Sequence, residues 1–182
     1  MTSNTTEKGW FRLLRSDLHA KAEWIYGASG TREILKALAT DGTLAMVLYR
    51  WMQASQRCRL SPLAMVFNKL NGIFGSCIIG RGAEFGPRFV LIHSNGIVIN
   101  GSVRGGHDVK IEHQVTIGAE RGDSPVLGDD LFIGAGAKII GAVKVGSGVR
   151  VGANAVIVKD VPDNVTAVGV PARYIQRKST TD

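Results

Sequence analysis

An apolar residue recurs at every sixth position along the second half of this 182-residue chain, apart from two short insertions. The thirteen positions are Ile79, Phe85, Leu91, Ile99, Gly105, Ile111, Ile117, Leu127, Ile133, Ile139, Val145, Val151 and Ile157. A second, mostly apolar series lies two residues earlier, from Cys77 to Ala155, and glycine often follows the first series. Six-residue repeats of this kind are typical of a parallel β-helix, in which each hexad forms one side of a coil. The repeat therefore predicts a solenoid and converts sequence positions into spatial columns.

The residues before the repeat have helical spacing instead. Apolar residues recur three or four positions apart over Trp10–Tyr26, which predicts a first helix. Further helices are expected over Thr31–Ala39, Leu44–Arg57 and Pro62–Asn71, with Thr43 as the N-cap of the third. We therefore expect a mainly β fold with an N-terminal α-helical region.

Three parts follow from this division: a helical region at 1–74, a β-helix at 75–161 and a tail at 162–182. No uninterrupted apolar run approaches the ~20 residues that span a bilayer, so no integral membrane segment is expected. The start of the chain, MTSNTTEKGW, lacks the basic residues and apolar core of a secretory signal. A cytoplasmic location is the resulting expectation.

The net charge bears on which ligands the chain could bind, and the cysteine spacing bears on metal sites and disulfides. The formal net charge of +7 is compatible with phosphate-bearing ligands, but from charge alone a solvated basic surface is the favoured interpretation. No dense basic run with interleaved aromatics is present, which argues against nucleic acid as a partner. Cys58 and Cys77 lack metal-ligand or CxxC spacing and are expected to be reduced thiols. Cys77 belongs to the inward series, so we expect it in the core.

One corner of the expected solenoid holds candidate chemistry. Hexads three apart stack at about the 4.8 Å strand spacing, which places His93, His113, Ala135 and Ala153 in one column. The twenty residues from His93 to His113 are one eighteen-residue coil plus two inserted near Ser94. An imidazole can accept a proton from a hydroxyl at neutral pH, and the alanines leave a smooth strip for a long, thin ligand. The column predicts a ligand groove with His93 as its base.

Four stretches carry a resemblance to a known family: LIHSNGIVIN, VTIGAERG, IGAGAKIIGAVKVGSGVRVGANAVIVKDVP and VGVPARYI. Together they resemble the hexapeptide acyltransferases with a left-handed β-helix, closest to the serine acetyltransferases and their relatives that acetylate sugars in polysaccharide synthesis. The resemblance covers residues 75–176 strongly and the preceding helices loosely. It implies a left-handed coil, acetyl-CoA as co-substrate bound between neighbouring prisms, no metal, and a homotrimer or a dimer of trimers.

The resemblance also implies roles for matched positions. His93 matches the general base, and His113 beside it is the second catalytic candidate. His113 is also common at this position in the polysaccharide relatives, where it would help to bind a sugar hydroxyl. For acetyl-CoA, the resemblance implies that Gly118 and Ala119 donate backbone N–H groups to the oxyanion. It implies that Ala135 and Ala153 line the pantetheine arm, and that Lys159 and Arg173 lie near the phosphates. Arg121 and Asp123 are expected acceptor contacts in the inserted AERGDSP loop.

The chain departs from the serine acetyltransferase pattern near the base. Ile92 replaces an Asp immediately before the histidine, and Ile78 replaces an Asp fifteen residues before it. The Arg-His-Pro acceptor loop is missing. The chain ends in Asp182 rather than in the isoleucine that docks some family members onto a sulfhydrylase, so we do not expect that complex.

The expected function is therefore an acetyl-CoA-dependent O-acetyltransferase of the serine acetyltransferase type, acting on L-serine or a similar small hydroxyl compound. The alternative acceptor is a sugar or an exopolysaccharide precursor. A metal enzyme resembling the γ-class carbonic anhydrases would use His93, His107 and His113, but His107 falls at another corner and the spacing does not match. A non-catalytic trimeric scaffold would leave the aligned histidines and alanines without a purpose.

Overall fold

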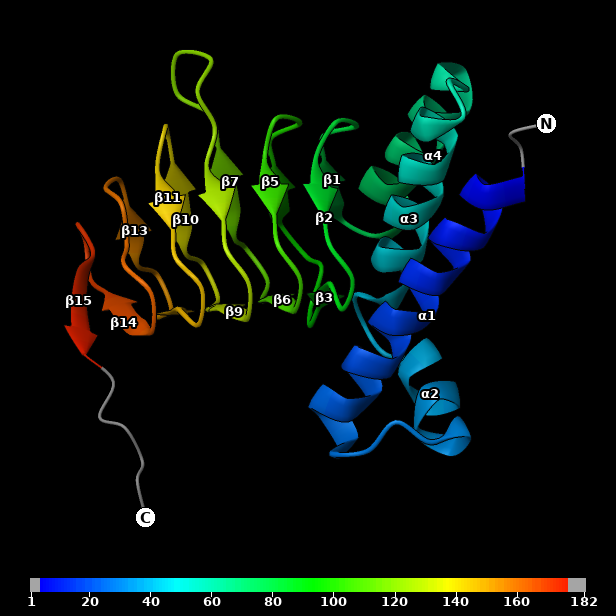
Figure 1. Ribbon diagram of the computed structural model, residues 1–182, viewed down its shortest axis with the longest axis horizontal. Coiled ribbons are helices and arrows are strands. Elements are labelled where there is room, and N and C mark those ends of the chain that lie inside the picture. Colours follow the sequence, from blue (N-terminus) through cyan, green and yellow to red (C-terminus); the bar gives the residue numbers. More distant parts are fainter. Residues whose placement is uncertain (1–3, 177–182) are drawn as a thin grey trace.

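The computed structural model describes residues 4–176 and has four helices packed at one end of a β-helix (Figure 1). The helices are α1 (Asn4–Tyr26), α2 (Thr31–Leu38), α3 (Thr43–Arg57) and α4 (Ser61–Phe74). None of the described helices is long and apolar enough to cross a membrane.

The β-helix makes five turns with three flat sheets as its sides. Sheet A contains β1 (Cys77–Ile79), β4 (Ile97–Ile99), β7 (Thr116–Gly118), β10 (Lys138–Ile140) and β13 (Val156–Ile157). Sheet B contains β2 (Glu84–Phe85), β5 (Arg104–Gly105), β8 (Val126–Leu127) and β11 (Lys144–Val145). Sheet C contains β3 (Val90–Leu91), β6 (Val109–Ile111), β9 (Leu131–Ile133), β12 (Arg150–Val151), β14 (Val165–Val168) and β15 (Arg173–Gln176).

The expected left-handed β-helix is confirmed, and the hexad positions form its core. Leu91 pairs with Ile111, and Ile111 pairs with Ile133, so residues of successive coils stack in register. All the large side chains of the first series are buried. Gly105 is the exception because the Phe85 ring fills its place: a Cβ there would lie 2.3 Å from the ring.

Several boundaries differ from expectation. The solenoid extends past residue 161, because β14 pairs in parallel with β12 and continues sheet C. β15 then turns back antiparallel to β14. Thr43 is not the N-cap of α3: Gly42 occupies that position, and the Thr43 hydroxyl donates to the Ala37 carbonyl instead. Asp182, on which the expected absence of a sulfhydrylase complex rests, lies outside the described residues.

The helices cap the open end of the solenoid. The first coil has no preceding coil to pair with, so its backbone groups need other partners. The Tyr49 hydroxyl accepts from the Phe85 N–H at 3.1 Å and donates to the Ala83 carbonyl at 3.2 Å. The Asn68 amide donates to the Ile79 carbonyl at 2.6 Å. Side chains from α3 and α4 thus replace the hydrogen bonds of a missing coil.

Arg50 makes the most extensive of these contacts. Its guanidinium donates to the carbonyls of Phe85 at 2.9 Å and Gly86 at 2.6 Å. The same group pairs with Asp17 of α1 at 2.6 Å, and both side chains are fully buried. Asp17 also accepts the Phe89 N–H at 2.9 Å. One buried ion pair therefore joins α1, α3 and the first coil.

The variant Asp17→Asn would leave the Arg50 guanidinium buried without its counter-charge. We expect the free energy of unfolding to fall by about 3–5 kcal/mol, measured by urea denaturation. Glu23→Gln is the matched control, because the Glu23–Arg88 pair at 2.8 Å is partly exposed and its loss should cost less than about 1 kcal/mol. Equal losses in the two variants would contradict the central role of the buried pair.

Candidate active site

The two candidate histidines lie together at the edge where sheet C meets sheet A. His93 follows β3 and His113 follows β6, and their ring centroids are 5.9 Å apart with the planes at 75°. The column continues through Ala135 and Ala153: the Gly136 N–H donates to the His113 carbonyl at 2.9 Å, and the next coil repeats this bond to Ala135 at 2.8 Å. The structure thus brings together two imidazoles and the small-residue strip.

A carboxylate that the sequence analysis missed faces His93. Asp41, in the turn between α2 and α3, places its Oδ2 3.1 Å from His93 Nδ1. Its Oδ1 accepts the Gly42 N–H at 2.7 Å and the Ser94 hydroxyl at 3.4 Å. Burial alone would raise the pKa of Asp41, but the hydrogen bonds with His93 and Gly42, together with the positive charge of Lys21, hold that pKa below its usual value. No spacing rule connects residues 52 positions apart, so the pair was not visible in the sequence.

Lys21 of α1 connects this turn to the end of β3. Its Nζ donates to the Leu91 carbonyl at 2.8 Å and to the Asp41 carbonyl. The Lys21 residue is completely buried. Burial lowers its pKa to about 8, with the charge of Asp41 acting in the opposite direction.

His113 has a carboxylate of its own. Glu112 precedes it, and its Oε2 lies 3.3 Å from His113 Nδ1. Both imidazoles at this edge are therefore paired through Nδ1 with a carboxylate.

The residues expected to contact the acetyl carbonyl and the acceptor lie at another edge of the prism. Gly118 ends β7 and Ala119 follows it, so the width of sheet A separates them from His113. Arg121 and Asp123 lie in the loop that stands out beyond β7 in Figure 1. Reciprocal backbone bonds of 2.9 Å between Glu120 and Asp123 close that loop. Within one chain these residues and His93 do not meet.

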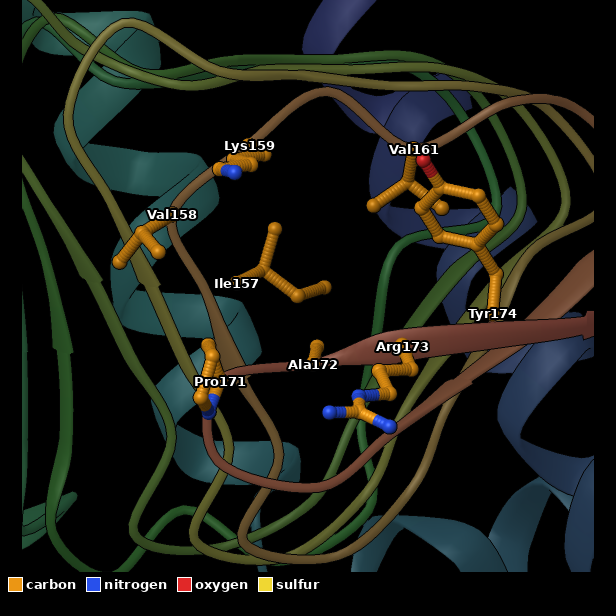
Figure 2. A pocket seen from close by; sticks show the side chains of 8 residues that line it. All are labelled: Ile157, Val158, Lys159, Val161, Pro171, Ala172, Arg173 and Tyr174. Carbon is orange, nitrogen blue, oxygen red and sulfur yellow. The ribbon is translucent and has the colours of Figure 1, made fainter.

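Lys159 and Arg173 share one pocket. It has a volume of about 390 Å³ and is lined by Ile157, Val158, Lys159, Val161, Pro171, Ala172, Arg173 and Tyr174. In Figure 2 the Lys159 and Arg173 side chains stand on opposite sides of the pocket with Ile157 between them. Two cations over an apolar floor suit a ligand that combines phosphate groups with a flat ring.

His107 is not part of the histidine pair. It lies on the edge between sheets B and C, with its Nε2 3.3 Å from Asp129 Oδ2. Within residues 4–176, no group of three or more His, Cys, Asp or Glu side chains is arranged to hold a metal ion. Cys77 is buried, as expected, whereas Cys58 is exposed, and both thiols are free.

Comparisons with known proteins agree with this geometry. The family model described as bacterial transferase hexapeptide (six repeats) matches residues 124–159. A serine acetyltransferase of Helicobacter pylori is 35% identical over 170 residues, which are 91% of this chain and 94% of the relative. A solved serine acetyltransferase in complex with CoA has a TM-score of 0.84 at 27% identity, over 92% of this chain and 70% of that chain. Soybean serine acetyltransferase complexed with serine has a TM-score of 0.83 at 31% identity, with the same coverage.

The repeat and its histidine column define a hexapeptide-repeat transferase. Within that class, the chain belongs to the serine acetyltransferase family. The expected family and the expected enzyme class, an O-acetyltransferase of the serine acetyltransferase type, are thereby confirmed. The family uses acetyl-CoA as its acetyl donor.

The depressed pKa of Lys21 predicts a stability change at alkaline pH. Between about 8 and its ordinary value of 10.5, the unfolded chain holds a proton that the folded chain has released. Stability therefore rises with pH across this window, by about 1.5 kcal/mol from pH 8 to 9.5. Urea denaturation of the wild type and of Lys21→Met at both pH values would measure it. The stability of the wild type relative to Lys21→Met should rise by about 1.5 kcal/mol between the two pH values, and a relative stability independent of pH would contradict the lowered pKa.

Proposed function

We propose that this protein transfers the acetyl group of acetyl-CoA to the hydroxyl of L-serine, the acceptor for which its relatives are named. The observation that carries the proposal is the His93 imidazole, held through Nδ1 by the Asp41 carboxylate at the head of the alanine strip. Because a carboxylate only accepts hydrogen bonds, Nδ1 carries the hydrogen, and in the neutral imidazole Nε2 then has the free lone pair. His93 is thus prepared to act as a general base.

The reaction follows from this tautomer. His93 Nε2 takes the proton of the serine hydroxyl while the hydroxyl oxygen attacks the thioester carbonyl carbon. Backbone N–H groups at Gly118 and Ala119 stabilise the oxyanion that forms. The carbon–sulfur bond then breaks, and the proton passes from His93 to the departing CoA sulfur. The products are O-acetylserine and CoA.

The base and the oxyanion donors lie at different edges of one prism, so a complete site requires a second subunit. We propose a homotrimer, alone or paired as a dimer of trimers, in which the His93 edge of one prism faces the Gly118 edge of the next. The outer face of sheet A supports this packing, because it exposes the apolar side chains of Ile78 and Val98. Acetyl-CoA then lies between neighbouring prisms, in the cytoplasm where this co-substrate is available.

The surroundings of the histidines support an amino acid acceptor. The carboxylates Asp41 and Glu112 lie beside the two rings, where an ammonium group would be stabilised. Arg121 and Asp123, on the exposed loop, are the proposed contacts for the rest of the acceptor. Arg121 would pair with the serine carboxylate.

One observation favours a sugar as the second candidate acceptor. Ile92 is buried and Ile78 exposes an aliphatic side chain, so neither supplies the carboxylate that the serine acetyltransferase pattern has at these positions. His113 beside His93 offers a second ring nitrogen, which suits an acceptor with adjacent hydroxyls.

The variant His93→Ala tests the proposed base. We expect acetyl transfer, followed as thiol release from acetyl-CoA with L-serine, to fall by about 10²–10⁴-fold, with the oligomeric state unchanged. His107→Ala, at a different edge, is the matched control and should retain full activity. Near-normal turnover in His93→Ala would overturn the assignment. The same assay with homoserine, sugars and sugar nucleotides ranks the two acceptor classes.

The cationic pocket gives a separate prediction for the acetyl donor. Lys159→Ala and Arg173→Ala should each weaken CoA binding roughly tenfold, measured by calorimetry, because each removes a charge-assisted bond to a phosphate. The loss should shrink as salt is added. Lys69→Ala, on an exposed position of α4, is the control and should bind CoA as the wild type does. Unchanged CoA affinity in both pocket variants would show that the CoA phosphates do not bind at this pocket.

A further inference from the structure

Neither position that the family pattern assigns to an acidic residue near the base holds a carboxylate in this chain. Ile92 and Ile78 cannot accept a hydrogen bond from an imidazole. An imidazole held only by packing can exchange its proton between Nδ1 and Nε2, which removes the lone pair from the reacting nitrogen in part of the molecules. A general base at His93 therefore needs an orienting group from another part of the chain.

We propose that Asp41 is the positioning residue of His93 and that Lys21 holds Asp41 in place. The proposal rests on the proposed function and assigns the orienting role to the helical region rather than to the β-helix. Asp41 Oδ2 lies 3.1 Å from His93 Nδ1, within hydrogen-bonding distance. The carboxylate selects the tautomer with hydrogen on Nδ1 and sets the plane of the ring.

The second oxygen of Asp41 keeps the carboxylate from rotating away. Oδ1 accepts the N–H of Gly42 and the hydroxyl of Ser94, at 2.7 and 3.4 Å. Without these bonds the side chain, which is 56% exposed, would be free to turn toward solvent. The Asp41 carboxylate is thus oriented from its own turn and from the residue that follows His93.

The turn itself is attached to the strand that carries the base. Lys21 Nζ bridges the Asp41 carbonyl and the Leu91 carbonyl, two residues before His93. Gly42 has φ of 76°, and a Cβ at this position would lie 2.4 Å from the Leu91 oxygen. The α2–α3 turn therefore rests directly on the end of β3.

Burying Lys21 is costly, and its contacts are local to this turn. An ammonium taken out of water loses several kcal/mol unless it is paired. Lys21 donates to the two carbonyls and is attracted by the charge of Asp41. Its hydrogen bonds therefore connect α1, the Asp41 turn and the end of β3, and they fix the position of the Asp41 turn relative to β3.

The kinetic test compares three Asp41 variants. Asp41→Asn and Asp41→Ala should lower kcat roughly 10²-fold while KM for acetyl-CoA stays within about twofold. Asp41→Glu retains a carboxylate and should recover part of the loss. Lys21→Met should lower kcat by less, about tenfold, because it loosens the turn without removing the carboxylate. Wild-type kcat in Asp41→Asn and Asp41→Ala would overturn the proposal.

A second measurement tests the pair without any acetyl transfer. The ¹⁵N resonances of the His93 ring report its tautomer, and Asp41→Asn should shift population from the Nδ1–H form to the Nε2–H form. The matched control is Asp129→Asn, which changes the carboxylate beside His107 and should alter neither kcat nor the His93 signals. An unchanged His93 tautomer in Asp41→Asn would overturn the positioning role. If the wild type does not acetylate serine, the proposed function fails while this readout still decides the role of Asp41.

Discussion

The Arg50 guanidinium lies where three parts of the molecule meet, and the rest of the structure depends on its contacts. It binds the Asp17 carboxylate of α1 and two backbone carbonyls of the first coil. A solenoid is stabilised mainly by contacts between neighbouring repeats, so its first coil is the weakest unless another element covers it. Here the cover is polar as well as apolar, because the exposed coil edge presents unpaired carbonyl and N–H groups. The four helices are therefore the terminal cap of the β-helix.

The cap and the candidate site are physically connected. α1 supplies both Asp17, which secures the first coil, and Lys21, which secures the turn that carries Asp41. β3 of the same coil leads directly into His93. His93, the proposed base, thus lies in the coil that the helices cover, where the Asp41 side chain from outside the β-helix reaches the corner. The second coil presents His113 on this edge, and the next two coils present Ala135 and Ala153, which leave a smooth strip suited to an extended ligand.

Much of the fold was predictable from the chain alone. The positions of the four helices and the stacking of His93 over His113 followed from periodicity, because the coil repeats every eighteen residues apart from counted insertions. The end of the solenoid was misjudged, since β14 continues sheet C without the regular hexad. The Asp41–His93 pair was not predictable either: its members are 52 residues apart, in segments with different periodicities.

The hexad repeat is sufficient to assign the β-helix, its core and the histidine–alanine column. Successive coils pair in parallel and in register, so equivalent positions of neighbouring coils stack on one another. The tertiary structure alone shows which groups surround that column. Asp41 beside His93, the buried Lys21 and Arg50 at the first coil all come from the helical region. Their positions depend on how the helices, which do not share the hexad repeat, pack against the coils. That packing follows from shape and from the need to pair buried polar groups, and neither leaves a regular spacing in the sequence.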